Sequence, residues 1–342
     1  MAHGIQETDT LLYNGSTAGQ GGTTWDQSTR EGGTPWHGLG IALPGVMTRS
    51  EVREHAPNFT APIHKTPVMY NGEPVKGQYL TIRTLNDGTE HVLGVVGSEY
   101  RVSQNDSMLE WAEQFCQDPS GPLFETVGTL WNGRKSFVLA KFPTDMIVKG
   151  RSGTADVIGQ YLLFSTSHDG SSHLQVQFTP IRVVCQNTLN MAGRGKDKNT
   201  SAYIMHSGDV NKKMANVANI LGIAQRKFTE TQELYQALVN VEPTREQVDA
   251  VLQQLIPDTT SNRAKLQRER VLTLSESGRG NAPYAGTGWG IYNGFTELVD
   301  HHNNTGSKRE DINDFRLDNI WFGSGMANKQ KALEVCTAGF LN

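Results

Sequence analysis

The stretch from Tyr161 to Ala192 reads YLLFSTSHDGSSHLQVQFTPIRVVCQNTLNMA. Its apolar opening leads into a turn-forming segment, HDGSS, and then apolar and polar residues alternate in HLQVQF. This alternation around a glycine-containing turn predicts a β-hairpin with one buried face. The alternation ends at Thr179 and Pro180, where Thr can cap a helix and Pro can occupy its first position. We therefore predict a helix from residue 181 onward.

The predicted helix carries a regular set of polar side chains. Arg182, Gln186 and Asn190 are spaced four residues apart, so they would form one ridge of hydrogen-bond donors. Such a ridge suits phosphates or base edges, since arginine forms strong charge-assisted bonds. Polar helix faces are also commonly plain solvated surface. The spacing alone leaves both interpretations open.

Two further hairpins are predicted before this stretch. YLTIRT and HVLGVVG flank Asn-Asp-Gly at 86–88, and FETVGTLW and KSFVLAKF flank Asn132-Gly133. Between them, Ser107 begins a capping box ahead of a helix that reads LEWAEQFC. Successive antiparallel hairpins without βαβ alternation predict an α+β domain over 34–200, with helices on one face of the hairpins.

The two ends of the chain differ from this domain. Residues 1–33 are rich in Gly, Ser, Thr and Gln, which predicts a disordered arm. Residues 201–342 are predicted to be mostly helical, with a capping box of Thr244 and Gln247 at the start of one helix. Apolar residues recur in steps of four and three from Val210 to Leu238, which indicates a long amphipathic helix. Its apolar seam fits either ordinary core packing or a self-associating coiled coil, so a homo-oligomer is one expectation.

Composition limits the classes of function. The 342 residues carry a formal net charge of −4, which argues against a protein whose whole surface attracts nucleic acid, so any basic site must be local. The three cysteines are far apart and predict neither a disulfide framework nor a metal knuckle. No long apolar run or signal-like N-terminus is present, so we expect a cytoplasmic protein without a membrane partner.

Enzymatic motifs are few. The sequence has no Walker loop, no GxGxxG after a strand, no HExxH and no GxSxG, so no cofactor is predicted. His168, Asp169 and His173 could converge as metal ligands of a metal-dependent enzyme. The same residues are typical of a turn followed by an exposed strand position, which is the interpretation we favour.

Local charge is the clearest positive signal. Between residues 182 and 227, basic residues outnumber acidic ones by six. The basic residues are Arg182, Arg194, Lys196, Lys198, Lys212, Lys213, Arg226 and Lys227. On the predicted helix, Lys212 and Arg226 lie fourteen residues apart, as do Lys213 and Lys227, so each pair would share a face about 21 Å apart. This stripe predicts contact with a nucleic-acid backbone, with a solvated helix face as the alternative.

Four motifs carry a resemblance to a known family: TPWHGLG at 34–40, GSEYRVSQND at 97–106, SHDGSSHLQVQFTPIRVVCQNTLNMA at 167–192 and TGWGIYNGFTELVDHH at 287–302. The chain resembles the uncharacterised phage/plasmid-like protein family of bacteriophages and mobile elements. This resemblance implies an accessory gene expressed in the cytoplasm of an infected bacterial host.

More loosely, hairpins closed by a helix are similar to the core of Rad-type single-strand annealing recombinases. That similarity is one of fold only, and it implies single-stranded DNA binding and homo-oligomers. The expected function is therefore a phage-encoded DNA-metabolism protein that binds single-stranded DNA through a local basic surface and promotes strand annealing. A non-enzymatic accessory protein that binds host or phage proteins is the alternative.

Overall fold

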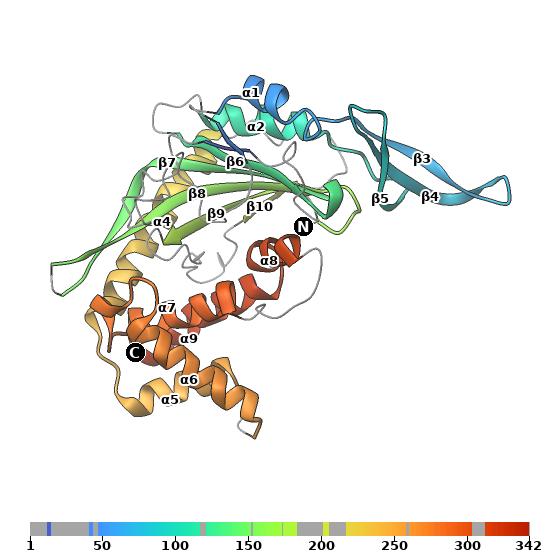
Figure 1. The fold of residues 1–342 in the computed structure, drawn as a ribbon. Helices are drawn as coiled ribbons and strands as arrows, with labels where there is room; N and C mark the ends of the chain where they lie inside the picture. Colours follow the sequence, from blue (N-terminus) through green and yellow to red (C-terminus); the bar gives the residue numbers. More distant parts are fainter. Residues whose placement is uncertain are drawn as a thin grey trace.

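The chain is an α+β protein in which antiparallel hairpins are followed by a mostly helical C-terminal region, as the sequence predicts (Figure 1). A computed structural model describes residues 12–14, 41–43, 47–116, 121–151, 153–172, 174–182, 201–204, 217–257, 260–302 and 312–341. Within these residues, no helix is both long enough and apolar enough to cross a membrane.

A seven-stranded sheet forms the centre of the fold, in the order β10-β9-β8-β7-β6-β1-β2. Its strands are β1 (Leu12–Asn14), β2 (Ile41–Leu43), β6 (Leu123–Leu130), β7 (Lys135–Lys149), β8 (Ala155–Ser167), β9 (Leu174–Arg182) and β10 (Ser201–Ile204). Neighbouring strands are antiparallel except β1 and β2. The hairpin β8–β9 and the hairpin β6–β7, which turns at Trp131–Gly133, are both where the sequence predicts them.

The prediction that a helix starts directly after Thr179-Pro180 is wrong. Strand β9 continues through Arg182, and Pro180 pairs with Gln160 of β8. Strand β10 pairs with β9 only from Leu174 to Gln177. Pro180 therefore faces no described strand on that side that would accept a hydrogen bond from its missing N–H. Residues 183–200 lie outside the described part of the chain, and a helix there stays a prediction.

The hairpin β8–β9 also differs from the prediction of a single buried face. Gln175 and Gln177, the polar partners in the alternation, are only 6% and 8% exposed. Gln175 Nε2 donates a hydrogen bond to Ser165 Oγ at 3.2 Å. The alternation therefore separates an apolar interior face from a polar interior face, because the sheet is covered on both sides.

The outer face of the sheet is covered by α1 (Arg49–His55), α2 (Asn105–Cys116) and α4 (Val217–Asn240). On α2, the rings of Trp111 and Phe115 meet the ring of Phe164 of β8 edge-on at 5.1 and 5.2 Å. The helix begins at Asn105, so Ser107 lies inside its first turn and the predicted capping box is wrong.

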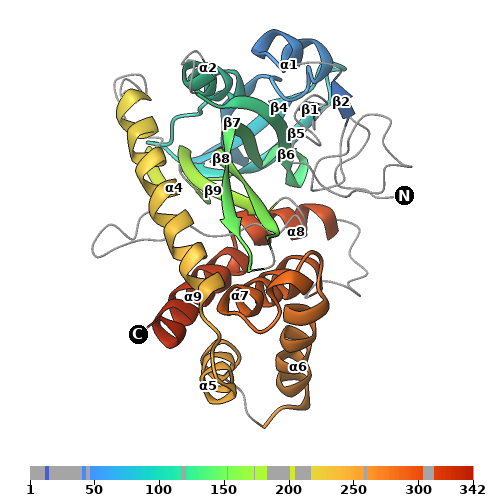
Figure 2. The ribbon, with the colours of Figure 1, turned by 90° about the vertical axis from the view of Figure 1, so that its left-hand side faces the viewer.

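The inner face of the sheet packs against α8 (Ile312–Trp321) of the C-terminal region. Leu317, Ile320 and Trp321 join an apolar cluster with residues of β6, β7, β8 and β9. The rings of Phe137 and Trp321 lie 4.7 Å apart within it. The sheet is therefore held between two helical layers, and its inner face looks onto the C-terminal helices (Figures 1 and 2).

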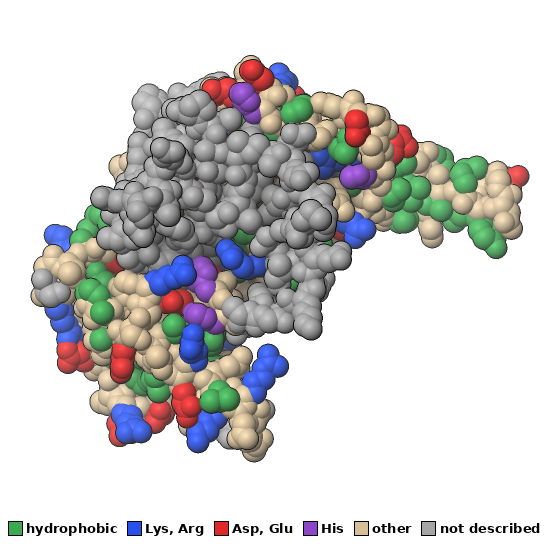
Figure 3. Space-filling view, in the orientation of Figure 1, with side chains coloured by type: hydrophobic (Ala, Val, Ile, Leu, Met, Phe, Trp, Pro, Cys, Tyr) green, Lys and Arg blue, Asp and Glu red, His purple; other side chains and the backbone are tan. Residues whose placement is uncertain are grey.

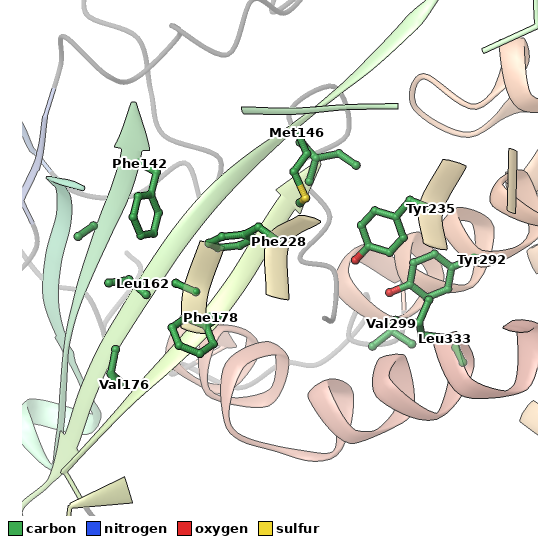
Figure 4. Packing of buried hydrophobic residues seen from close by; sticks show 14 of the residues in the cluster. Phe142, Met146, Leu162, Val176, Phe178, Phe228, Tyr235, Tyr292, Val299 and Leu333 are labelled. Carbon is green, nitrogen blue, oxygen red and sulfur yellow. The ribbon is translucent and has the colours of Figure 1, made fainter. Parts of the chain in front are cut away.

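Helix α4 connects the sheet to the C-terminal region (Figure 2). At its middle, Phe228 contacts Phe142 and Phe178 of the sheet (Figure 4). Nearer its end, the ring of Tyr235 lies 4.7 Å from the ring of Trp289. The apolar seam of this helix is thus buried inside one chain, which supports the core-packing interpretation. Residues 205–216, the predicted first part of the helix, are not among those described.

The C-terminal region is an assembly of helices. It contains α5 (Arg245–Leu255), α6 (Asn262–Ser277), the 3-10 turn η3 (Ala282–Tyr284), α7 (Gly288–Glu297), the π-helical turn η4 (Leu298–His302), α8 and α9 (Ser324–Phe340). The predicted capping box at the start of α5 is confirmed, with Thr244 and Gln247 bonded to each other's backbone N–H. Strand β10 belongs to the central sheet, so the helical region begins after residue 204 rather than at 201.

A second, three-stranded sheet projects from the body (Figure 1). It consists of β3 (Ile63–Tyr70), β4 (Glu73–Thr84) and β5 (Glu90–Gly97). The hairpin β4–β5 matches the prediction, whereas the hairpin β3–β4 was missed although Asn71-Gly72 forms its turn with positive φ at both residues.

The predicted N-terminal arm contains one described element. Leu12–Asn14, inside the segment predicted to be disordered, form β1 and pair with both β2 and β6. Glycine-rich composition does not prevent a short segment from adding to a sheet whose edge offers unpaired backbone groups. The other residues of 1–33 lie outside the described part of the chain.

Candidate functional site

Two of the ten predicted nucleic-acid-binding residues have described side chains. Arg226 is exposed, and Lys227 is half-buried with its Nζ 3.8 Å from Glu230 Oε2. Both lie on α4, which covers the outer face of the sheet, and Arg182 is described only as the last backbone position of β9. The remaining seven lie outside the described residues: Gln186, Asn190, Arg194, Lys196, Lys198, Lys212 and Lys213.

Two of the three predicted metal ligands, His168 and Asp169, form hydrogen bonds within the fold. His168 is buried, with its ring Nε2 2.8 Å from Asn105 Oδ1, and its carbonyl accepts a bond from Thr81 Oγ1 at 2.6 Å. Asp169 Oδ1 accepts the N–H of Ser171 at 2.8 Å, as a turn residue does. His173 lies outside the described residues. These contacts support the turn interpretation, and the described chain brings together no set of three His, Cys, Asp or Glu that could hold a metal.

The structure brings a different set of charges together where α7 ends. There the chain widens into the π-helical turn η4, a distortion that is frequent at functional sites. Asp300 in this turn accepts a hydrogen bond from Lys329 Nζ of α9 at 2.7 Å. Both side chains are only 1% exposed. Burial lowers the pKa of Lys329, while Asp300 acts in the opposite direction. The negative charge of Asp300 is thus matched inside the protein.

Two histidines follow Asp300 in the same turn. Burial lowers the pKa of His301 to about 4, with Asp300 opposing this shift and with Arg316, Arg279 and His302 acting in the same direction as burial. His301 Nε2 is buried and has no hydrogen-bond partner in the described chain. His302 Nε2 lies 3.8 Å from Glu297 Oε1. At neutral pH His301 is therefore an uncharged ring held among cations.

Two arginines complete this group. Arg316 of α8 is half-buried, and its pKa is lowered by burial and by Arg279, with Asp300 opposing. Arg279 is exposed, and its backbone N–H donates to Glu297 Oε2 at 3.1 Å. The carboxylates of α8 are engaged elsewhere. Asp314 accepts the backbone N–H of Trp131 at 2.6 Å, and Asp318 accepts Lys135 Nζ at 2.5 Å.

We call this group the junction cluster: Arg279, His301, His302 and Arg316 around the Asp300–Lys329 pair. Among the described residues, three Lys or Arg side chains face two carboxylates, Asp300 and Glu297, so their positive charge is in excess even before either histidine is protonated. Paired arginines favour phosphate because the guanidinium fork matches its oxygens. Lys, Arg and His side chains gather over this part of the C-terminal region in the space-filling view (Figure 3).

A second polar group lies on the inner face of the sheet. Its members are Glu125 of β6, Lys141 and Asp145 of β7, and Tyr161 of β8, which we call the inner-face tetrad. Tyr161 Oη donates to Glu125 Oε1 at 3.2 Å, and Lys141 Nζ lies 3.6 Å from Asp145 Oδ1. Burial raises the pKa of Glu125 to about 7, with Lys141 and the bond from Tyr161 opposing.

The raised pKa of Glu125 has a consequence for stability. The unfolded chain, in which this carboxyl has a pKa near 4.5, releases its proton well before the folded protein does. The parent therefore loses stability from this group as pH rises from 4.5 through 7. We expect the Glu125→Gln variant to gain stability relative to the parent over that interval, by up to about 3 kcal/mol.

Urea unfolding of the parent and the Glu125→Gln variant at pH 5 and pH 7.5 measures this difference. The comparison between variants is essential because His301 has the opposite effect. Its lowered pKa makes the folded protein more stable as pH rises over nearly the same interval. The parent's own pH profile would thus hide both effects. A stability difference that stays constant between the two pH values would contradict the assigned ionisation.

Both groups were missed by sequence reasoning, for the same reason. His301 and His302 end the motif TGWGIYNGFTELVDHH, but the sequence offers no partner for them at a regular spacing because Arg316 and Lys329 come from α8 and α9. Glu125 and Lys141 lay within strands of an ordinary predicted hairpin. The only local signal was a charged residue in an otherwise apolar strand, which is uncommon at a buried position.

Comparison with known proteins identifies the family. No curated protein and no solved structure matches the chain. A family described as a domain of unknown function (DUF932) matches residues 92–321. The matched segment includes the whole inner-face tetrad and every member of the junction cluster except Lys329. Because the match covers more than half of the 342 residues, the chain belongs to the DUF932 family.

Proposed function

We propose that this protein binds single-stranded nucleic acid through phosphate contacts at the junction cluster. One observation carries the proposal. Arg316 is a half-buried guanidinium with no hydrogen-bonded acceptor among the described residues, and the additional positive charge of Arg279 lies close to it. A partly buried guanidinium without a hydrogen-bonded acceptor is costly, and a phosphate would supply negative charge together with bidentate hydrogen bonds.

The neighbouring groups favour the same ligand. Asp300 is already bound to Lys329, so it does not neutralise Arg316 by direct contact. His301 Nε2, unpartnered in the described chain and beside the arginines, can add a bond to a phosphate oxygen. The half-buried position of Arg316 also suits an unpaired strand, whose flexible backbone can approach it more closely than a stiff duplex can. The basic residues predicted at 182–213 are candidates for further contacts along such a strand.

The biological context extends the proposal. The motifs at 167–192 and 287–302 resemble a phage and plasmid family, and the second of these motifs contains His301 and His302. A protein of this kind would act in DNA metabolism in the cytoplasm of an infected bacterial host. Single-strand binding by a homo-oligomer would allow it to bring complementary strands together, as in strand annealing.

A direct binding measurement tests the proposal. We expect fluorescence anisotropy of a labelled thirty-nucleotide strand to show saturable binding that weakens steeply with salt, because phosphate contacts release counterions. Unlabelled single strand should compete well and duplex of the same length poorly. Failure to bind any strand at low salt would refute the proposed function.

A second candidate function rests on the three-stranded sheet. Met69, Tyr70, Val92 and Val95 are each more than half exposed on this projecting element, which is unusual for four large apolar side chains of one small sheet. This surface supports the alternative of an accessory protein that binds host or phage proteins. Capture of a protein partner that resists high salt, without any binding of nucleic acid, would favour that alternative.

A further inference from the structure

The inner-face tetrad is built at two irregularities of the sheet. The register of β6 against β7 shifts between Phe124 and Thr126, which places Glu125 in a β-bulge. The register of β7 against β8 shifts between Lys141 and Asp145. Bulges redirect side chains, and they are over-represented next to functional sites. Here they set two carboxylates beside one lysine and one tyrosine on the face that looks onto the C-terminal helices.

The tetrad leaves hydrogen-bonding capacity unused. Glu125 is 4% exposed, yet its Oε2 has no hydrogen-bond partner in the part of the chain that the structure describes, and the same holds for Asp145 Oδ1. Lys141 Nζ, at 3.6 Å from Asp145 Oδ1, is too distant for a good hydrogen bond. Buried polar groups are normally satisfied, so two acceptors without a hydrogen-bond partner, beside a lysine that contacts Asp145 only at long range, point to a ligand that donates to the carboxylates and accepts from the lysine.

We propose that the inner-face tetrad binds the edge of an amino-bearing nucleobase of the bound strand, an inference that rests on the proposed function. The exocyclic amino group of cytosine, adenine or guanine would donate to Glu125 and Asp145, as carboxylates accept from cytosine in base recognition. The neighbouring ring nitrogen or carbonyl of the base would accept from Lys141. A metal ion would fill the two acceptors but would repel Lys141, so it matches the site less well.

The tetrad and the junction cluster lie on the same side of the sheet. Tyr161 belongs to the apolar cluster that Leu317 of α8 enters, and Leu317 directly follows Arg316 in the chain. Access is available at the Asp145 end, where that side chain is 20% exposed and Leu123 is 36% exposed. Under this proposal, the strand that places a phosphate at Arg316 on α8 also places a base at Glu125, on the face of the sheet that α8 covers.

Base preference tests this inference. At pH 8 and fixed salt, where the Glu125 carboxylate is ionised, we expect the parent to bind twenty-nucleotide oligo(dC) about tenfold more tightly than oligo(dT). Thymine has no amino group, so it would leave both carboxylates unpaired. In the Glu125→Met variant, which keeps the volume of the side chain, the affinity for oligo(dC) should fall to the level of oligo(dT). Glu233→Met, an exposed position on α4, is the matched control and should keep the tenfold preference.

The outcomes are distinguishable. Equal binding of oligo(dC) and oligo(dT) by the parent, or an unchanged preference in a folded Glu125→Met protein, would overturn the base site while leaving phosphate binding intact. If that variant fails to fold, Lys141→Met gives the same test, because it removes the donor to the ring acceptor. Loss of all strand binding in the parent would overturn the proposed function and the base site together.

Discussion

Replacing Lys329 by Met is expected to destabilise the fold by about 3–5 kcal/mol, because it leaves the charge of Asp300 buried without its partner. The ammonium and the carboxylate are 2.7 Å apart, and neither side chain has meaningful access to water. Urea unfolding at pH 7.5 measures the loss. Lys331→Met, an exposed position on the same helix, is the matched control and should change stability by no more than about 0.5 kcal/mol.

The double variant Asp300→Leu with Lys329→Met separates the cost of an orphaned charge from the value of the pair. Replacing a whole buried ion pair by apolar residues is often close to neutral, so most of the lost stability should return. A Lys329→Met protein within about 1 kcal/mol of the parent would show that Asp300 is neutral or reaches water, and the charge balance of the junction cluster would then be wrong.

Reversing the charge of both arginines is expected to remove strand binding. In the Arg279→Glu, Arg316→Glu variant, two attractive phosphate contacts become repulsive, so we expect the affinity for a single strand to fall by at least about 100-fold. The new carboxylate at 316 would lie near Asp300 and destabilise the fold, so Arg279→Gln with Arg316→Gln is the gentler companion. Circular dichroism and thermal unfolding would verify that each variant is folded.

Arg263→Glu with Arg270→Glu is the matched control for this experiment. Both residues are exposed on α6, so the control makes the same change in net charge away from the junction cluster. It should lower the affinity only slightly, through the overall charge. Equal losses in the two double variants would show that binding depends on net charge alone and not on this site.

Much of the fold followed from local sequence. Turn signals such as Asn132-Gly133 placed the hairpins, since few residues accept positive φ, and the capping box at Thr244 placed a helix start. Local signals failed where a tertiary contact decided the outcome. Thr179-Pro180 matches a helix start, but pairing with β8 holds it in a strand. Gln175 looked exposed because the sequence does not reveal that the second face of the sheet is covered.

The candidate site was harder to predict than the fold because its residues meet only in three dimensions. Asp300 and Lys329 are brought together by the packing of η4 against α9, and Arg316 joins them from α8. Glu125 and Asp145 reach their places through bulges, which shift register without a strong sequence mark. The basic residues that the sequence did single out on α4 lie on the other face of the sheet, which only the packing of Phe228 reveals.

The dependence of single-strand affinity on salt, compared between the parent and the Arg316→Gln variant, tests the central claim most directly. Each phosphate contact contributes about 0.7 to the slope of log affinity against log salt for a single strand. If Arg316 binds a phosphate, the slope of the variant should be shallower than that of the parent by roughly this amount, with a matching loss of affinity. Identical slopes and affinities in a folded variant would contradict the assignment of the junction cluster as the phosphate site.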